Sequence, residues 1–154
     1  MILSFKRALI YFILAYCIVT VLASATSITY GIVNHSPESP PGVSILKAPE
    51  FVATVPYHVL IMLIVWPVFA WLYFRKRKNE NYSMELKETL QLSSFWLTGA
   101  ILVDFIGFVM IKHPYSLTAF EFYVVYQPWI SLIYISIFLS PYIRLGLSKL
   151  LAKR

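Results

Sequence analysis

Asp104 is the residue of this chain best suited to a chemical role, because it is an acidic side chain inside a long apolar segment. It precedes Lys112 by eight positions, so a helix rising ~1.5 Å per residue would place it ~12 Å from the helix end. An ionised carboxylate at that depth in a membrane is costly unless it is paired, hydrated or protonated. Two interpretations stay open: a contact to an ion, proton or substrate, or an interhelical hydrogen bond to a Tyr, Gln or His.

The predicted helix places Asp104 on one face with Ala100, Gly107 and Phe108, so we expect its side chain to point into a helix bundle. Other polar residues are expected at a similar depth in the outer half of the membrane. The candidate members of an outward-opening polar site are Asp104, His58, Gln127, Tyr123 and Ser27, with Ser24 and Ser131 nearby.

Few other chemistries find support in the residue pattern. A pair of His58 with Asp104 would supply an acid and a base at the outer leaflet, but the sequence offers no convincing nucleophile. The histidines are scattered and lack the spacings of a metal site, and the single Cys17 allows neither an intramolecular disulfide nor a thiolate cluster. Nucleotide-binding and hydrolase motifs are missing too, so no metal and no cofactor is expected.

The elements that position these residues are four apolar segments, at about residues 8–31, 56–74, 92–111 and 122–143. Each is close to the ~20 residues that a helix needs to cross a ~30 Å hydrocarbon core. A spanning segment must satisfy its own backbone polar groups, which makes helix the expected state. With 59% hydrophobic and 13% charged residues, the chain predicts one all-α transmembrane domain covering residues 1–154.

The basic residues alternate along the chain and predict an orientation. Lys6 and Arg7 precede the first segment, while the loop at residues 32–55 carries only Lys47. The loop at residues 75–91 is strongly basic, the next carries Lys112 alone, and the tail is basic again. Because positive loops stay in the cytoplasm, the chain is predicted to be an antiparallel four-helix bundle with both termini cytoplasmic.

The basic run Arg75, Lys76, Arg77 and Lys78 is interpreted as a membrane anchor that attracts anionic lipid. The net charge of +6 therefore needs no nucleic acid, for which no motif is present. One alternative concerns the first segment, since Lys6-Arg7, an apolar run and Ala23-Ser24-Ala25 also resemble a cleavable signal peptide. Apolar residues continue to Val33, which favours a retained span.

Small residues, a capping pair and a proline predict local features of helix packing and helix ends. Thr20, Ser24, Ser27 and Gly31 follow helical spacing in the first segment, and Gly99 and Gly107 lie in the third, so close helix packing is expected there. Thr118 and Glu121 have the spacing of a capping box. Pro128 is expected inside the fourth helix, where it would bend the helix and free the carbonyl of Val124.

Three classes of function remain, and the preferred one is a non-enzymatic accessory or assembly subunit of a membrane complex. Small size and the lack of a soluble domain or motif favour this class, which implies a protein partner or a homo-oligomer in the lipid bilayer. The first alternative is an oligomeric small transporter or channel with its polar site at Asp104. The second is an outer-leaflet enzyme using Asp104 and His58. Abundant Ile and Lys with little Ala suggest a bacterial cytoplasmic membrane.

Overall fold

The computed structural model describes residues 3–36, 44–75, 82–113 and 116–152, and these residues contain helices but no strands. Four helices among them are long and apolar enough to cross a membrane. They are α1 (Phe5–Val33), α2 (Pro49–Phe74), α3 (Tyr82–Asp104) and α4 (Trp129–Ala152). The expectation of an all-α chain with four candidate membrane spans is confirmed.

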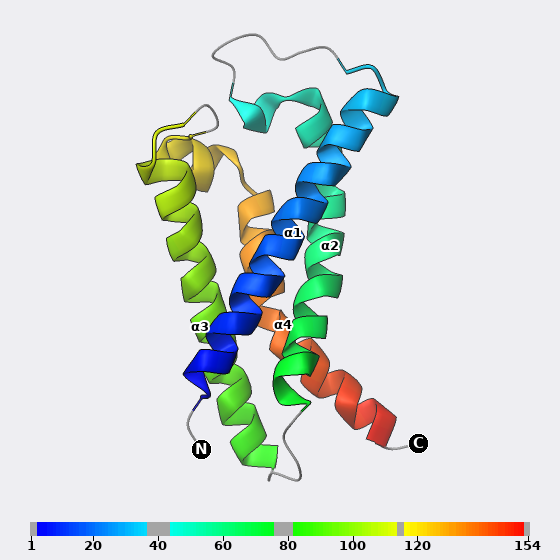
Figure 1. Ribbon diagram of the computed structural model, residues 1–154, viewed down its shortest axis with the longest axis vertical. Coiled ribbons are helices and arrows are strands. Elements are labelled where there is room, and N and C mark those ends of the chain that lie inside the picture. The colour runs from blue at the N-terminus through cyan, green and yellow to red at the C-terminus, as the bar shows by residue number, and fades with distance from the viewer. Residues whose placement is uncertain (1–2, 37–43, 76–81, 114–115, 153–154) are drawn as a thin grey trace.

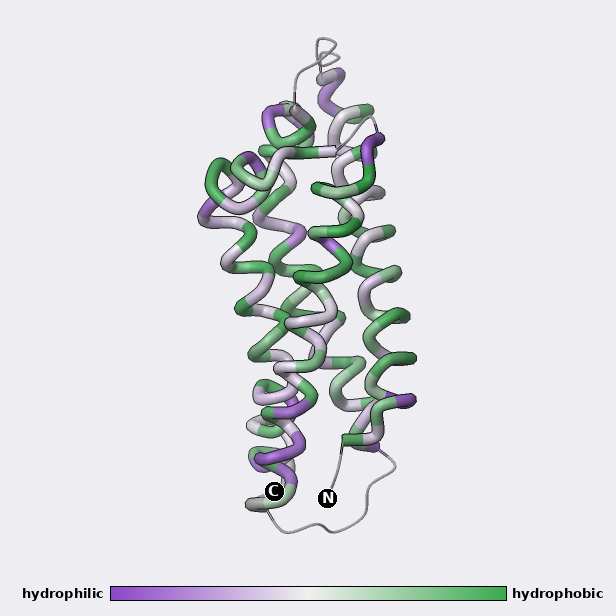
Figure 2. Tube along the Cα trace, turned by 90° about the vertical axis from the view of Figure 1, so that its left-hand side faces the viewer, coloured by the Kyte–Doolittle hydropathy of each residue, from purple (hydrophilic) through white to green (hydrophobic). Residues whose placement is uncertain are grey.

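The helices form an elongated bundle in which α2 packs extensively on α1 and α4, and α3 packs on α4 (Figure 1). Contacts between α1 and α3 are fewer, and the two helices diverge toward the top of the view. The first residues of α1 and the last residues of α4 lie at the same end. Figure 2 shows hydrophobic residues along the middle of the bundle and hydrophilic ones gathered toward its two ends.

Helices α2 and α3 begin well before the residues that the hydropathy pattern predicts. Helix α2 starts at Pro49 instead of Pro56, and a proline suits this first position because the helix leaves its N–H unused. Helix α3 starts at Tyr82 instead of residue 92, so the predicted basic loop at residues 75–91 is partly helical. A hydropathy pattern misses such a turn because its residues are polar, although Glu88 and Thr89 are buried against neighbouring helices.

The prediction of one continuous helix at residues 122–143, bent at Pro128, is wrong. A π-helical segment, Glu121–Val125, is followed by a turn, and α4 begins only at Trp129. Proline lacks an N–H and clashes with the preceding turn, which explains why the helix starts after Pro128. The carbonyl of Val124 is not left free, because the Gln127 N–H donates to it at 3.3 Å.

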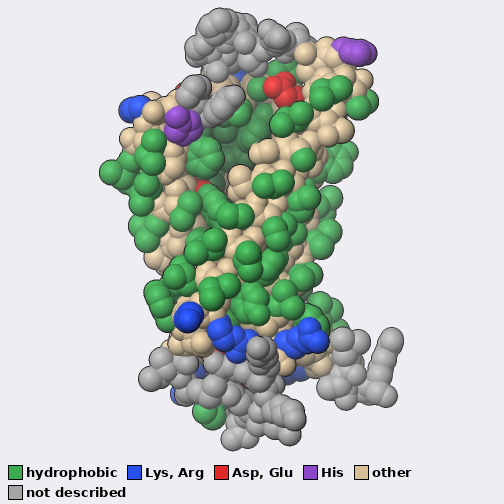
Figure 3. Space-filling view, viewed as in Figure 1, with side chains coloured by type: hydrophobic (Ala, Val, Ile, Leu, Met, Phe, Trp, Pro, Cys, Tyr) green, Lys and Arg blue, Asp and Glu red, His purple; other side chains and the backbone are tan. Residues whose placement is uncertain are grey.

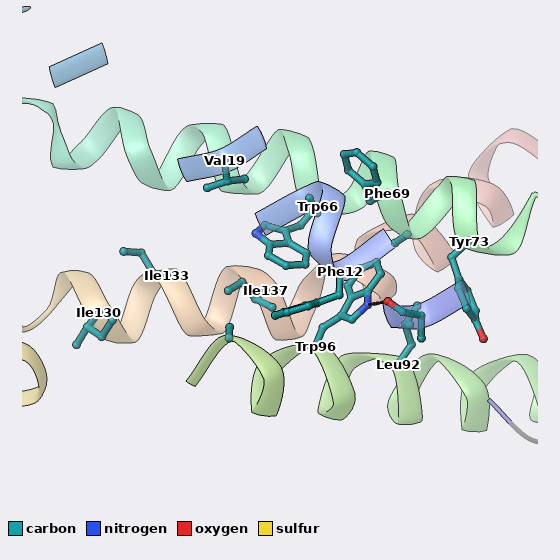
Figure 4. Close-up of a cluster of buried hydrophobic side chains, with 14 of the residues drawn as sticks. Phe12, Val19, Trp66, Phe69, Tyr73, Leu92, Trp96, Ile130, Ile133 and Ile137 are labelled. Carbon is teal, nitrogen blue, oxygen red and sulfur yellow. Dashed lines mark hydrogen bonds between the residues drawn. The ribbon is translucent and has the colours of Figure 1, made fainter. Parts of the chain in front are cut away.

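The core is aromatic at the level where α1, α2 and α3 approach one another (Figure 4). The rings of Trp66 and Trp96 have centroids 5.2 Å apart, and Phe12 lies 5.9 Å from Trp66. The Trp96 indole N–H donates to the Ala8 carbonyl at 3.0 Å, so its polar atom is satisfied inside the bundle. This aromatic layer joins α1, α2 and α3 and is continued on α4 by Ile137.

The face of α1 that enters the core consists of Ala8, Phe12, Ala15 and Val19. The predicted small-residue stripe is therefore only partly correct, since Thr20 and Ser24 are exposed. Thr20 donates to the Tyr16 carbonyl of its own helix at 2.8 Å and needs no neighbour. The later part of the stripe does face α2, where an ideal Cβ on Gly31 would lie 3.5 Å from Glu50 Cβ.

Gly99 permits the close approach of α3 to α1, whereas Gly107 does not contribute in this way. An ideal Cβ on Gly99 would lie 3.0 Å from Phe12 Cζ, but one on Gly107 would meet no atom within 4 Å. We expect Gly99→Leu to push Phe12 against Trp66 and lower the free energy of unfolding by about 1–3 kcal/mol. Titration with SDS in mixed micelles measures this loss. The matched control is Gly146→Leu, at an exposed site with open space, and equal losses in both variants would refute the packing role.

The predicted capping box is present before the π-helical segment. The Thr118 N–H and hydroxyl donate to Glu121 Oε2 at 2.8 and 2.9 Å, and the Glu121 N–H donates back to Thr118 Oγ1 at 3.1 Å. The backbone N–H of Thr118, followed by its hydroxyl, lowers the pKa of the Glu121 carboxyl. The stabilisation is therefore fully present above the unfolded-state pKa and is lost as the pH falls through the lowered folded-state pKa.

A carboxyl NMR titration checks this pH dependence. We expect the Glu121 midpoint to lie below the ordinary glutamate value and to rise in Thr118→Val, which removes the hydroxyl donor. Thr118→Ser keeps the donor and should leave the midpoint low. An unchanged midpoint in Thr118→Val would show that the hydroxyl does not act on the carboxylate.

Candidate functional site

Asp104 is the last residue of α3, and its carboxylate lies where α1, α3 and α4 meet. The side chain is 8% exposed. The Tyr16 hydroxyl of α1 donates to Oδ1, and the Tyr134 hydroxyl of α4 donates to Oδ2 at 3.0 Å. Each of the two carboxylate oxygens therefore accepts a hydrogen bond from a different helix. This geometry corresponds to the tyrosine form of the interhelical bond considered from the sequence.

Tyr16 and Tyr134 were not among the predicted site residues. The signal that could have identified them is their position in the middle of apolar segments, away from the ends where membrane tyrosines usually lie. A hydroxyl at mid-segment needs a partner inside the protein, because the surrounding lipid offers none. Mid-segment tyrosines would therefore have been reasonable partners to assign to a mid-segment aspartate.

Two further tyrosines border this site. The Tyr123 hydroxyl interacts with that of Tyr134, so this predicted residue reaches Asp104 through one intermediate side chain. Tyr126 is buried and interacts electrostatically with Asp104, and its ring lies 5.7 Å from that of Phe51 on α2. Directly after Asp104, the α-helix widens into a π-helical segment, Phe105–Met110. Such segments are frequent at functional sites.

His58 lies in a separate cluster between α1 and α2. Its Nε2 atom is 3.1 Å from Ser27 Oγ, and Ser27 Oγ is 2.7 Å from Thr54 Oγ1. The Thr54 hydroxyl also lies 2.7 Å from the Glu50 carbonyl oxygen. A carbonyl can only accept, so the threonine hydroxyl is the donor of this bond. Among the described residues, no hydrogen bond joins His58 to Asp104.

Hydrogen counting assigns a direction to this His58 cluster. Thr54 uses its one hydroxyl hydrogen on the Glu50 carbonyl, so Ser27 must donate to Thr54, and His58 must donate its Nε2–H to Ser27. In a nucleophile pair the serine donates to the histidine, which is the opposite direction. The cluster therefore joins α1 to α2 through a directed chain of hydrogen bonds, without activating Ser27.

Gln127 lies in the turn before α4 and is exposed. Its side-chain amide donates to the Tyr123 carbonyl at 3.1 Å, and the Ser131 hydroxyl donates to its carbonyl oxygen at 2.7 Å. These bonds join residues four positions apart and stabilise the turn around Pro128. The predicted site is thus divided into an Asp104–tyrosine cluster, a His58–Ser27 cluster and a braced turn.

The end of the bundle at which α1 begins holds polar contacts that were not expected from the sequence. Glu88 is 1% exposed and accepts a hydrogen bond from the Tyr73 hydroxyl, while Arg7 donates to the Tyr73 carbonyl. Glu85 pairs with Arg144, whose guanidinium lies 4.5 Å from the centroid of the Phe74 ring. Their partners lie on other helices, so the sequence gives no sign of these contacts.

A buried stripe on α3 connects the two halves. Glu88, Leu92, Trp96, Ala100 and Asp104 recur every four residues and are all buried. The stripe begins and ends with a carboxylate that accepts a tyrosine hydroxyl, and the aromatic layer lies between the two. Such an arrangement can hold the helices in register.

The surface next to Asp104 is apolar. A shallow depression beside Tyr134 is lined by Leu97, Ile135, Phe138 and Leu139. Figure 3 shows a hollow between the upper parts of α1 and α3 whose visible walls are mostly hydrophobic. Among the described residues, no three His, Cys, Asp or Glu side chains come together as metal ligands would.

Comparison with known proteins identifies no relative, since no family model, no curated protein and no solved structure matches this chain.

Proposed function

We propose that this protein is a non-enzymatic accessory or assembly subunit of a membrane complex. The observation that carries the proposal is the use of both Asp104 oxygens by Tyr16 and Tyr134, which makes the carboxylate a connector of three helices. Interhelical hydrogen bonds are a main source of helix association in lipid, where no hydrophobic drive acts between helices. The described polar contacts of His58 and Glu88 likewise join helices.

The proposed arrangement is an antiparallel bundle with both termini in the cytoplasm of a bacterial cell. The pairs Glu85–Arg144 and Asp104–Tyr134 support it, because they join the start of α3 to the later part of α4 and the end of α3 to its earlier part. The alternating basic loops support the orientation. Retention of the first span is supported by the α1 residues that fill the core.

Contact with anionic lipid at the cytoplasmic end also belongs to the proposal. Arg75 is exposed and lies 5.3 Å from the centroid of the Trp71 ring, an arrangement suited to the headgroup level. The other members of the predicted basic run, Lys76, Arg77 and Lys78, lie outside the described residues.

Native mass spectrometry of the protein, extracted gently from its own membrane, tests the accessory role. We expect a complex with a different protein in a fixed ratio, retained after mild detergent exchange. A homo-oligomer or a monomer as the sole species would contradict the proposal. Asp104→Asn supplies a second readout, because an amide still accepts from one tyrosine and should leave partner binding intact.

A second candidate is transport by an oligomer through a polar site at Asp104. It is favoured by the run of interacting hydroxyls from Tyr123 through Tyr134 to Asp104 and Tyr16. Flux into proteoliposomes that depends on pH and disappears in Asp104→Asn, at normal protein abundance, would favour this candidate. Enzymatic use of Asp104 with His58 is not proposed, because the two side chains belong to different hydrogen-bonded clusters.

A further inference from the structure

Two buried hydroxyl groups in the inner half of α3 lack a partner in the protein. Thr89 and Ser93 are both 0% exposed, and neither Thr89 Oγ1 nor Ser93 Oγ has a hydrogen-bond partner. Helical threonine and serine usually donate to a carbonyl of the preceding turn. Ser136 and Ser140 of α4 follow that habit, with bonds of 2.7 Å to Leu132 and 2.8 Å to Ile137.

The register of α3 and α4 places these four hydroxyl residues along one interface. Thr89 and Ser93 lie one and two turns beyond Glu85, and Ser140 and Ser136 lie one and two turns before Arg144. Since Glu85 and Arg144 are in contact, the two runs lie along facing sides of packed helices. Both runs are buried, which agrees with this placement.

The hydrogen-bonding capacity at this interface fits water. Thr89 and Ser93 can each donate one hydrogen and accept two, and Ser140 can still accept after donating to its own helix. A buried water molecule makes two to four hydrogen bonds to groups that would otherwise be unsatisfied. A cation fits less well, because the Glu85 carboxylate is paired with Arg144 and the Glu88 carboxylate accepts a hydrogen bond from Tyr73.

We propose that Thr89 and Ser93, together with Ser140, form an internal water-binding site between α3 and α4. The inner half of the interface between α3 and α4 is then hydrated. This site is independent of any partner and of the role proposed for Asp104.

Water-to-protein cross-relaxation measured by NMR on the full chain in lipid nanodiscs tests the proposal. We expect water cross-peaks at the Thr89 methyl group and at the amides of Thr89 and Ser93, but none at the buried Ala100, which serves as an internal control. Absence of a water cross-peak at both residues in the wild-type protein would overturn the proposal. This experiment needs no variant to fold.

Variants then assign the water to the two hydroxyls. In Thr89→Val with Ser93→Ala, the cross-peaks at this interface should disappear, and the melting temperature should fall or stay the same. The matched control is Ser136→Ala, whose hydroxyl is satisfied within its own helix, so the cross-peaks at Thr89 should persist. Cross-peaks that survive the double substitution, or a melting temperature that rises because two dry hydroxyls have been removed, would overturn the assignment.

Discussion

Asp104→Leu is expected to lower the free energy of unfolding by about 1–4 kcal/mol, because it removes two interhelical hydrogen bonds worth ~0.6–2 kcal/mol each. Leucine is apolar and accepts no hydrogen bond. The Tyr16 and Tyr134 hydroxyls then lose the acceptor that joins α1 and α4 to α3. SDS titration of the purified protein measures the loss, and the fraction inserted in the membrane reports whether the variant still assembles.

A double-mutant cycle separates this connection from a general effect of changing Asp104. Tyr16→Phe and Tyr134→Phe should each destabilise the wild-type protein, yet add little in the Asp104→Leu background, where their acceptor is gone. Thr20→Val is the control, because the Thr20 hydroxyl bonds its own helix and is exposed. Additive effects of the tyrosine and aspartate substitutions would show that the three side chains are not energetically connected.

Trp96→Ala is expected to cause the other large loss, about 3–5 kcal/mol in the free energy of unfolding. Trp96 is 0% exposed, contacts Trp66 in the centre of the bundle and donates its indole N–H to α1. Alanine leaves a cavity that adjacent helices can close only in part, and leaves the Ala8 carbonyl without this donor. Thermal unfolding followed by tryptophan fluorescence would detect the change.

Trp71→Ala provides the matched control for the aromatic layer. Trp71 is 49% exposed on α2, where lipid can replace the lost side-chain contacts. We expect a much smaller loss of stability than in Trp96→Ala. Comparable losses in the two variants would mean that the effect follows from tryptophan content, and that the packing around Trp96 is of no special importance.

The helix ends show which features of this chain can be predicted from neighbouring residues in the sequence. The box formed by Thr118 and Glu121 was predictable, because both partners lie within one turn of the same segment. The burial of polar residues near the start of α3 was not, because it depends on contacts with other helices. Glu88 is an example, as its hydroxyl donor, Tyr73, lies at the end of α2.

The polar side chains also divide into features that the sequence indicates and features that depend on contacts between helices. Asp104 stands out in the sequence, because a charge inside an apolar segment is rare and needs a partner. Its partners come from positions 88 residues earlier and 30 residues later in the chain, so sequence spacing carries no information about them. His58 was expected at a similar depth to Asp104, but its side chain turns toward Ser27 on α1.

The amino-acid sequence alone is enough to predict a helical protein with four candidate membrane spans. The length and hydropathy of each segment suffice for that, because a bilayer acts on each segment separately. The side of each helix that faces the core depends on contacts between helices, which the sequence does not reveal. Large apolar residues cover the exposed side of the helices as well as the core, so composition does not distinguish them. Lipid is as apolar as the core, and packing and hydrogen bonds alone set the rotation and register of each helix.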